Sequence, residues 1–384
     1  MTDLCPHFGD CGGCSTQDQP LAEQRAEKED RVRRVLSPWL EGDFPSLISS
    51  PDSFFYRNKM EFCFGGLKDE PPLLGLRRRG RFDRVVDLSE CRLLSPEIGA
   101  LLKAVRGWAL ADGRPTYHLK SHRGFLRYLV VREGKNTGQR MICLVTAEGN
   151  SPGLGFQKAV EASGVRVDTA VWAVNSTLSD VAFGEEREIL WGDGFIEEKL
   201  GDQRFRISPK TFFQTNTRGA EVLYGEIAGL LSDSPVAVLF DLYCGTGTIG
   251  LFLANKVQRV VGVELNPASV LDAQSNAAAL GVSAEFIQAD ASVFAKDPSW
   301  STVWALPGTV AVLDPPRPGL SGDVIRLLME KPLERWVYVS CNPEALTRDL
   351  GALSAVYRLQ SVRVVDLFPH TPHVETVVLL VKKG

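Results

Sequence analysis

The sequence predicts an α/β protein whose C-terminal half is a doubly wound, mostly parallel sheet that ends in an antiparallel hairpin. Short apolar runs alternate with helical segments across residues 236–355. Such alternation is typical of a parallel sheet covered by helices on both faces. The last two apolar runs are joined by a short loop without a helix, so we expect them to pair antiparallel.

The elements of this half follow one another closely from about residue 206. The expected strands are Val236–Leu242, Arg259–Leu265, Ala284–Gln288, Thr309–Leu313, Trp336–Ser340, Val362–Phe368 and Val374–Lys382. The expected helices are Thr248–Val257, Ala268–Leu280, Asp323–Glu330 and Glu344–Ala355. We assign residues 206–384 to one domain on this pattern.

Two further regions precede this domain. Residues 1–95 contain a cysteine-rich start, a charged helix expected over Leu21–Leu36 and a basic hairpin. Residues 96–205 predict a small α+β domain, with a helix followed by strands rich in aliphatic and β-branched residues. Those strands are Leu126–Arg132, Met141–Ala147 and Thr169–Val174.

The composition is that of a soluble globular protein. Hydrophobic residues make up 44% and charged residues 23% of the 384 residues, both ordinary proportions. No apolar run approaches the roughly 20 residues that span a bilayer, and the first residues lack the pattern of a signal peptide. We therefore expect a cytoplasmic monomer with no membrane partner.

One dense basic stretch interrupts an otherwise acidic chain of net charge −4. It could be a solvated hairpin surface or a site of phosphate contact. Charge alone does not decide between these interpretations. Its members are Arg77, Arg78, Arg79, Arg81 and Arg84.

A glycine-rich turn follows the first strand of the C-terminal domain and opens a helix. Gly245, Gly247 and Gly250 nominally match a dinucleotide-binding turn. Asp241, at the strand end, would oppose a pyrophosphate but suits a ligand with a sulfonium and an amino group. Glu264, about 20 residues after the turn, can accept both ribose hydroxyls. These residues favour S-adenosylmethionine over a nicotinamide cofactor.

Acidic residues close four successive strands of the predicted sheet. Ligands of open α/β sheets bind outside the carboxyl ends of the strands, where these side chains should meet. Any one of them could instead cap a helix, but four in register make capping a weak joint explanation. The four are Asp241, Glu264, Asp290 and Asp314.

A thiol and a carboxylate follow the last parallel strand and the final loop. Cys341 precedes a helix, where its pKa can be lowered so that it acts as a nucleophile. Glu375 opens an apolar strand, and burial could raise its pKa into the range for proton transfer. His370 and His373 are alternative bases, although structural roles suit these loop residues better.

At this point the chain resembles the RNA uracil-5 methyltransferase family. The matching strings are Phe212-Phe213-Gln214-Thr215-Asn216, Asp241-Leu242-Tyr243-Cys244-Gly245, Asp314-Pro315-Pro316-Arg317, Ser340-Cys341-Asn342 and Pro369-His370-Thr371-Pro372-His373-Val374-Glu375. Their joint order is far more specific than any one of them. The resemblance implies the class I S-adenosylmethionine methyltransferase fold for residues 206–384.

The resemblance also implies a covalent reaction and its residues. Cys341 would add to carbon 6 of a uracil, and Glu375 would remove the carbon 5 proton after methyl transfer. Asp314 could contact either the cofactor or the uracil. The remaining cofactor contacts implied are Gln214, Tyr243, Thr248, Glu264 and Asp290.

Cysteines crowd the N-terminus in a pattern that suits metal binding. Cys5, Cys11 and Cys14 have the spacing of three ligands, and Cys91 could be a distant fourth. A Cys₄ zinc site is the alternative, although only one Cys-x₂-Cys pair is present. Similarity to the iron–sulfur members of the family implies a 4Fe-4S cluster. Because the reaction has no redox step, we expect a structural or RNA-docking role.

The substrate expected from the resemblance is RNA. The chain resembles the shorter 23S ribosomal RNA enzymes that lack an N-terminal oligonucleotide-binding domain, while some cluster-bearing relatives modify transfer RNA. An adenine-N6 methyltransferase is a rival, since it also uses Asp-Pro-Pro, but it has no use for Cys341. A second rival is a non-catalytic RNA-binding relative.

Overall fold

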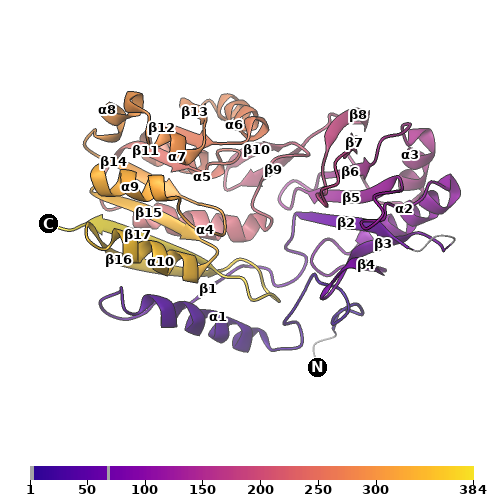
Figure 1. Cartoon of the computed structure of the whole chain (residues 1–384), viewed down its shortest axis with the longest axis horizontal. Helices are drawn as coiled ribbons and strands as arrows, with labels where there is room; N and C mark the ends of the chain where they lie inside the picture. Colours follow the sequence, from indigo (N-terminus) through magenta and orange to yellow (C-terminus); the bar gives the residue numbers. More distant parts are fainter. Residues whose placement is uncertain (1–3, 67–69) are drawn as a thin grey trace.

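The computed structural model describes residues 4–66 and 70–384, which form two lobes, each built around one sheet (Figure 1). The C-terminal lobe holds an eight-stranded sheet and the other lobe a seven-stranded sheet. A two-stranded hairpin links them in sequence; it consists of β9 (Ile196–Leu200) and β10 (Gln203–Ile207).

The eight-stranded sheet confirms the predicted doubly wound topology. Its strand order is β1-β16-β17-β15-β14-β11-β12-β13, and every pairing is parallel except the two made by β17. β17 is inserted antiparallel between β16 and β15, as the short final loop predicts. The strands are β1 (Ile48–Ser49), β11 (Val236–Leu242), β12 (Val257–Glu264), β13 (Ala284–Gln288), β14 (Thr309–Leu313), β15 (Arg335–Ser340), β16 (Tyr357–Asp366) and β17 (Glu375–Lys382).

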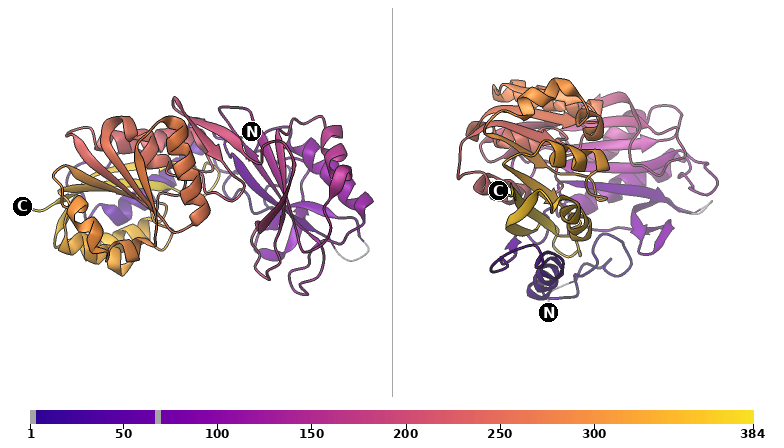
Figure 2. Two further views of the ribbon diagram at one scale, coloured as in Figure 1. Left: turned by 90° about the horizontal axis from the view of Figure 1, so that it is seen from above. Right: turned by 60° about the vertical axis from the view of Figure 1, so that its left-hand side comes forward.

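Helices cover both faces of this sheet (Figure 2). Along β15 the side chains alternate between two apolar cores, with Trp336 and Tyr338 in one and Val337 and Val339 in the other. This double burial explains the nearly continuous apolar strands. The helices are α4 (Thr217–Leu230), α5 (Thr248–Phe252), α6 (Pro267–Leu280), α7 (Ala291–Phe294), α8 (Ser301–Trp304), α9 (Gly322–Glu330) and α10 (Pro343–Leu353), with short 3₁₀ turns η1 (Ala254–Lys256) and η2 (Pro298–Trp300).

The seven-stranded sheet has the order β4-β3-β2-β5-β6-β7-β8. Helices α2 (Ile98–Asp112) and α3 (Gly153–Ala162) share one apolar core with one face of it. The strands are β2 (Lys59–Gly65), β3 (Leu73–Arg78), β4 (Arg81–Asp87), β5 (Leu126–Glu133), β6 (Arg140–Thr146), β7 (Thr169–Val174) and β8 (Glu185–Trp191).

The sheets do not follow the boundary that we predict between residues 95 and 96. β2 pairs with β5, so strands from both sides of that boundary share one sheet. Helix α1 (Leu21–Leu36) belongs to the other lobe, where Val32 and Leu36 are fully buried in the core that also holds Trp336. Pairings between such distant segments leave no local pattern in the sequence, so the sequence alone does not reveal this division.

Most C-terminal elements lie within a few residues of their predicted positions. Two differences reach five residues: β16 begins at Tyr357 instead of Val362, and the helix expected over Thr248–Val257 ends as α5 at Phe252. Val257 already pairs with Val236 as the first residue of β12, so the helix cannot continue. Within the described chain, no helix is both long and apolar enough for a membrane span.

Candidate active site

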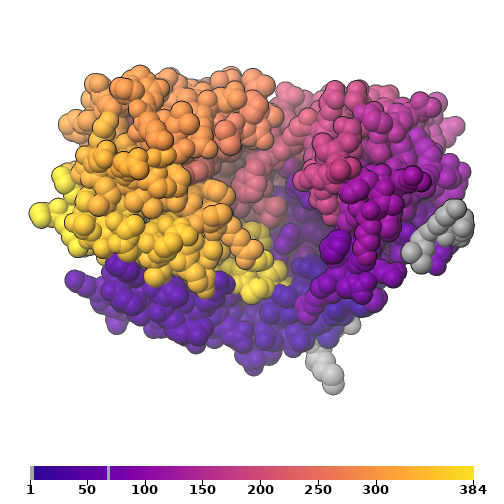
Figure 3. Space-filling view, viewed as in Figure 1, coloured from indigo at the N-terminus to yellow at the C-terminus, as the bar shows by residue number. Residues whose placement is uncertain are grey.

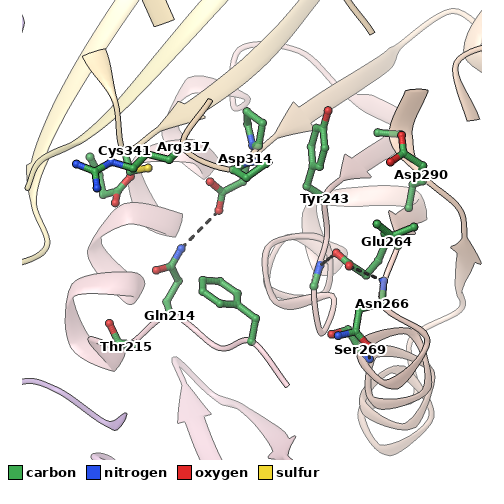
Figure 4. A pocket seen from close by; sticks show the side chains of 18 of the residues that line it. Gln214, Thr215, Tyr243, Glu264, Asn266, Ser269, Asp290, Asp314, Arg317 and Cys341 are labelled. Carbon is green, nitrogen blue, oxygen red and sulfur yellow. Dashed lines mark hydrogen bonds between the residues drawn. The ribbon is translucent and has the colours of Figure 1, made fainter. Parts of the chain in front are cut away.

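A cavity of about 680 Å³ opens at the carboxyl ends of the parallel strands, as expected for this topology. Its size suits a small-molecule ligand. Figure 4 shows Cys341 and Arg317 at one end, Glu264 and Asp290 at the other, and Asp314 and Tyr243 between them. All but one of the residues predicted for the reaction and the cofactor line it: Gln214, Tyr243, Glu264, Asp290, Asp314, Cys341 and Glu375.

The glycine-rich turn brings the backbone to the cavity through left-handed conformations. Tyr243 has φ 66° and Gly247 has φ 75°. At Gly247 a Cβ would lie 2.8 Å from the Phe286 ring, so only glycine fits there. The turn is tied to β12, because the Gly245 N–H donates to the Glu264 carboxylate at 3.0 Å.

Two carboxylates mark the end of the cavity formed by β12 and β13. Glu264 also accepts the Asn266 N–H at 2.8 Å, so each of its oxygens has one partner and keeps a lone pair for a hydroxyl. Asp290 caps α7 by accepting the Ser292 N–H at 2.7 Å. Hydrogen bonds from Ser292 lower the pKa of the Asp290 carboxyl. Asp290 is therefore both a helix cap and a cavity-lining acid.

A thiol and two carboxyl groups gather at the opposite end. Cys341 follows β15, and burial raises its thiol pKa to about 11, with repulsion from Glu375 and Asp314 adding to the effect. Arg317 acts in the opposite direction. The lowered pKa that we predict for Cys341 is therefore not found, because the desolvation and negative neighbours outweigh the following helix.

The two acids beside this thiol are shifted toward their protonated forms. Burial raises the pKa of Asp314 to about 7, although a hydrogen bond from Gln214 partly opposes the shift. Glu375 is only 5% exposed, and burial, followed by repulsion from Asp314, raises its pKa well above the usual value. A buried carboxyl group whose pKa is shifted in this direction suits proton transfer.

Two residues of the glycine-rich segment point into the fold instead of the cavity. Asp241 is fully buried, and its carboxylate accepts the Gly250 N–H at 2.8 Å. Thr248 is 7% exposed, and its hydroxyl is 3.1 Å from the hydroxyl of Tyr224 on α4. Neither side chain lines the cavity, so the predicted cofactor contact of Thr248 finds no support there.

The two loop histidines occupy different environments. His373 lines the cavity, whereas His370 does not. The His370 ring is 4.3 Å from the Phe54 ring in a stacked arrangement, and burial lowers its pKa to about 4. Of the two alternative bases, only His373 is placed to face a substrate.

Several cavity residues were not singled out from the sequence. Phe212 is 59% exposed although it belongs to the motif that supplies Gln214. Arg317 closes the Asp-Pro-Pro-Arg string, which indicated a site without showing which member reaches it. Asn266 and Ser269, at the start of α6, had no signal beyond that of a helix cap.

The four N-terminal cysteines lie near one another. Cys11, Cys14 and Cys91 are buried in the same apolar core, and Cys5 is partly exposed. Burial and then repulsion from the other three thiols raise the pKa of Cys14 to about 12. Nevertheless, across residues 4–66 and 70–384 no three His, Cys, Asp or Glu side chains form a group that could hold a metal ion. The expected cluster is therefore not shown.

Two arginines of the basic stretch contact the loop that carries Cys11 and Cys14. Arg79 donates to the Cys14 carbonyl at 2.7 Å, and its backbone N–H donates to the Asp10 carbonyl at 2.8 Å. Arg78 forms an ion pair with the Asp10 carboxylate at 3.2 Å. At these positions the arginines have structural partners, and phosphate contact stays a prediction.

Comparison with protein families finds two matches in the C-terminal lobe. Residues 305–383 match a family described as tRNA (Uracil-5-)-methyltransferase. Residues 239–331 match a methyltransferase domain. The two matches meet over the segment that contains Asp314 and Arg317.

Full-length relatives extend the likeness to the whole chain. An uncharacterised RNA methyltransferase from Nitratidesulfovibrio vulgaris is 40% identical, and the match covers 99% of this chain and 82% of the relative. A tRNA (uracil(54)-C(5))-methyltransferase from Pyrococcus horikoshii is 36% identical over 98% of this chain and 85% of its own.

A solved structure agrees in fold. The tRNA (uracil-54, C5)-methyltransferase of Pyrococcus abyssi, in complex with S-adenosyl-L-homocysteine, superposes with a TM-score of 0.80 at 31% identity. The match covers 97% of this chain and 86% of the other.

Proposed function

The chain belongs to the RNA (uracil-5-)-methyltransferase family, whose members use S-adenosylmethionine, and on this premise we propose that Cys341 is its nucleophile and Glu375 its general base. The observation that carries the proposal is the convergence of this thiol and this buried carboxyl in one cavity. Membership of this family argues against the adenine-N6 methyltransferase alternative, in which the Cys341 thiol would have no role.

The chemistry explains why both groups are needed. Carbon 5 of uracil is a weak nucleophile. The Cys341 thiolate adds to carbon 6, so that carbon 5 carries enolate character. Carbon 5 would then take the methyl group of S-adenosylmethionine, whose sulfur–methyl bond breaks to leave S-adenosyl-L-homocysteine. Glu375 then accepts the carbon 5 proton, the double bond between carbons 5 and 6 re-forms, and the thiolate leaves. A buried carboxyl of raised pKa suits this last proton transfer.

S-adenosylmethionine supplies the electrophilic methyl group. The residues that line the cavity suit S-adenosylmethionine. They include carboxylates and polar side chains, and Glu264 keeps free lone pairs for the ribose hydroxyls. We assign Glu264 and Asp290 to the nucleoside part. Gln214, Tyr243 and Asp314, which lie between these acids and Cys341, are assigned to the part near the methyl group.

Within the RNA, the proposed target is a uridine. Its base must flip out of the stacked RNA to reach Cys341. Two relatives are named for uridine 54 of transfer RNA, which supports transfer RNA as the first substrate to test. The earlier expectation of 23S ribosomal RNA has no support from these relatives and is the second candidate.

We also propose that Cys5, Cys11, Cys14 and Cys91 hold a 4Fe-4S cluster. Their proximity supports this, because repulsion between these thiols adds to burial in raising the pKa values of Cys11, Cys14 and Cys91. A four-iron cluster is larger than a single ion, so its ligands stand farther apart. Methyl transfer moves no electron through the chain, and we assign the cluster a structural role.

The deciding experiment uses labelled S-adenosylmethionine with unmodified transfer RNA and 23S ribosomal RNA transcripts, followed by nucleoside analysis. We expect 5-methyluridine, formed in transfer RNA. Label in ribosomal RNA alone would select the second substrate, and methyladenosine would overturn the reaction assigned. Absence of transfer to either RNA would favour the non-catalytic alternative.

A further inference from the structure

The loop between β16 and β17, residues 367–374, forms one wall of the cavity. Phe368 and His373 line the cavity from this loop, and Glu375 follows it directly. The loop lies against the N-terminal segment, at the base of the hollow between the two lobes (Figure 3). No strand pairing holds the eight residues, so other contacts must position them.

Gln24 of α1 makes the most specific of these contacts. It is 2% exposed, and its side-chain oxygen accepts the His370 backbone N–H at 2.9 Å. Its nitrogen lies 3.2 Å from His370 Nδ1 and also donates to the carbonyls of Thr16 and Gln19 at 2.7 and 2.9 Å. One buried amide therefore joins the cysteine segment, the helix and the loop.

His370 needs such support because its backbone is unusual. Its φ of 63° lies in the left-handed region, which non-glycine residues avoid. Such conformations persist only where surrounding contacts over-determine them, and they cluster near functional sites. The Ser15 and Thr16 N–H groups add bonds to the His370 carbonyl at 2.9 and 3.2 Å.

Other contacts hold the loop mostly through its backbone carbonyls. Lys28 donates to the Asp366 carboxylate and to the Phe368 carbonyl. Tyr56 donates its hydroxyl proton to the Pro369 carbonyl at 3.0 Å. Gln24 differs because it engages both the backbone and the ring of the strained residue.

We propose that Gln24 is a positioning residue for the uracil side of the cavity, acting through His370. This inference rests on the proposed function, since it assigns the loop wall to the base that reacts with Cys341. The cofactor end, at Glu264 and Asp290, comes from β12 and β13 and has no contact with Gln24 among the described hydrogen bonds. Loosening the loop should therefore slow attack on the base while S-adenosylmethionine binding persists.

The test uses RNA that carries 5-fluorouridine. Fluorine cannot be removed as a cation, so each competent site stops as a covalent protein–RNA adduct. The amplitude of adduct formation gives the fraction of protein with a competent site. Its rate constant reports how well the base is positioned for attack by Cys341. For Gln24→Ala we expect a rate constant lower by about 10- to 100-fold, because small misplacements of reacting groups have effects of that size. The amplitude per cofactor-binding molecule and the cofactor Kd should stay unchanged.

The matched control is Val32→Ala, which disturbs the same helix at a fully buried position and removes no hydrogen bond to the loop. It should keep the wild-type rate constant. Gln24→Met, which keeps the volume and removes the hydrogen bonds, serves if the alanine variant does not fold. A wild-type rate constant in the Gln24 variants, or an equal loss in Val32→Ala, would overturn the proposal.

Failure of the proposed function gives a different result. If the wild-type protein methylates uridine but forms no adduct with the fluorinated RNA, the covalent route is wrong. Turnover on ordinary RNA, per cofactor-binding molecule, then decides the role of Gln24 with the same variants. An unchanged turnover in Gln24→Met would overturn it.

Discussion

Gln214 and Asp314, 100 residues apart in the chain, meet across the cavity, where the Gln214 amide donates to the Asp314 carboxylate at 3.5 Å. Gln214 precedes α4, and Asp314 follows β14. The contact joins the segment that enters the C-terminal lobe to the centre of its sheet. It places an amide beside an acid whose pKa is about 7.

Removing this amide should weaken the cofactor site. We expect Gln214→Ala to raise the Kd for S-adenosylmethionine about tenfold, the size of one hydrogen bond to a charged group. Isothermal titration calorimetry measures it. Thr248→Val is the control, because Thr248 lies outside the cavity, and its Kd should change less than about twofold. A large loss of cofactor affinity in Thr248→Val would instead support the cofactor contact that the family resemblance predicts for Thr248.

Glu375→Gln should stop the reaction after methyl transfer. Without a base for the carbon 5 proton, the thiolate cannot leave, and turnover should fall by about 10²- to 10⁴-fold. Denaturing gels should show a protein–RNA adduct that contains the transferred label. Cys341→Ala should form no adduct and still bind the cofactor. Glu375→Gln that binds RNA, keeps Cys341 and accumulates nothing would remove Glu375 from this role.

The stability of the fold should depend on pH through Asp241. Burial, as the main cause, raises its pKa to about 7, whereas an unfolded aspartate titrates near its model value of 3.8. Between these values the unfolded chain loses its proton first, so the folded state is progressively penalised as pH rises. Asp241→Asn keeps an acceptor for the Gly250 N–H and carries no charge.

Asp241→Asn should therefore raise Tm relative to wild type at pH 8 and have little effect at pH 4. Thermal unfolding at both values checks this, with Asp233→Asn, an exposed site, as the control. An equal gain at both pH values would show that the carboxyl is not protonated in the native protein.

Loss of the proposed four-cysteine cluster should reduce the stability of the N-terminal region without altering the residues proposed for methyl transfer. Cys91→Ser should lose iron and brown colour after anaerobic purification. Hydrogen exchange should increase in the cysteine loop and in the β3–β4 hairpin that Arg79 ties to it. Cys143→Ser is the control, because Cys143 lies on β6 and is buried in a different core. Zinc in place of iron in the wild-type protein would favour the alternative metal.

Much of the C-terminal lobe is predictable because local sequence patterns, together with the rules of sheet topology, are enough to place its strands and their ends. Strands with apolar residues on both faces must lie inside a sheet, and acids at their carboxyl ends must share an edge. Glu264, Asp290 and Asp314 follow from that rule alone. The same rule placed Asp241 in the cavity, whereas its side chain turned inward to cap the backbone at Gly250.

The sequence by itself determined the alternation of strands and helices, the final hairpin and the order of the motifs, since these depend on neighbours in the chain. Only the tertiary structure decided the raised pKa of Cys341, the inward orientation of Thr248 and the attachment of α1 to the opposite lobe from β2. These properties arise from burial and from contacts between residues that are tens to hundreds of positions apart, such as Thr248 with Tyr224 and Gln24 with His370. No local pattern encodes them.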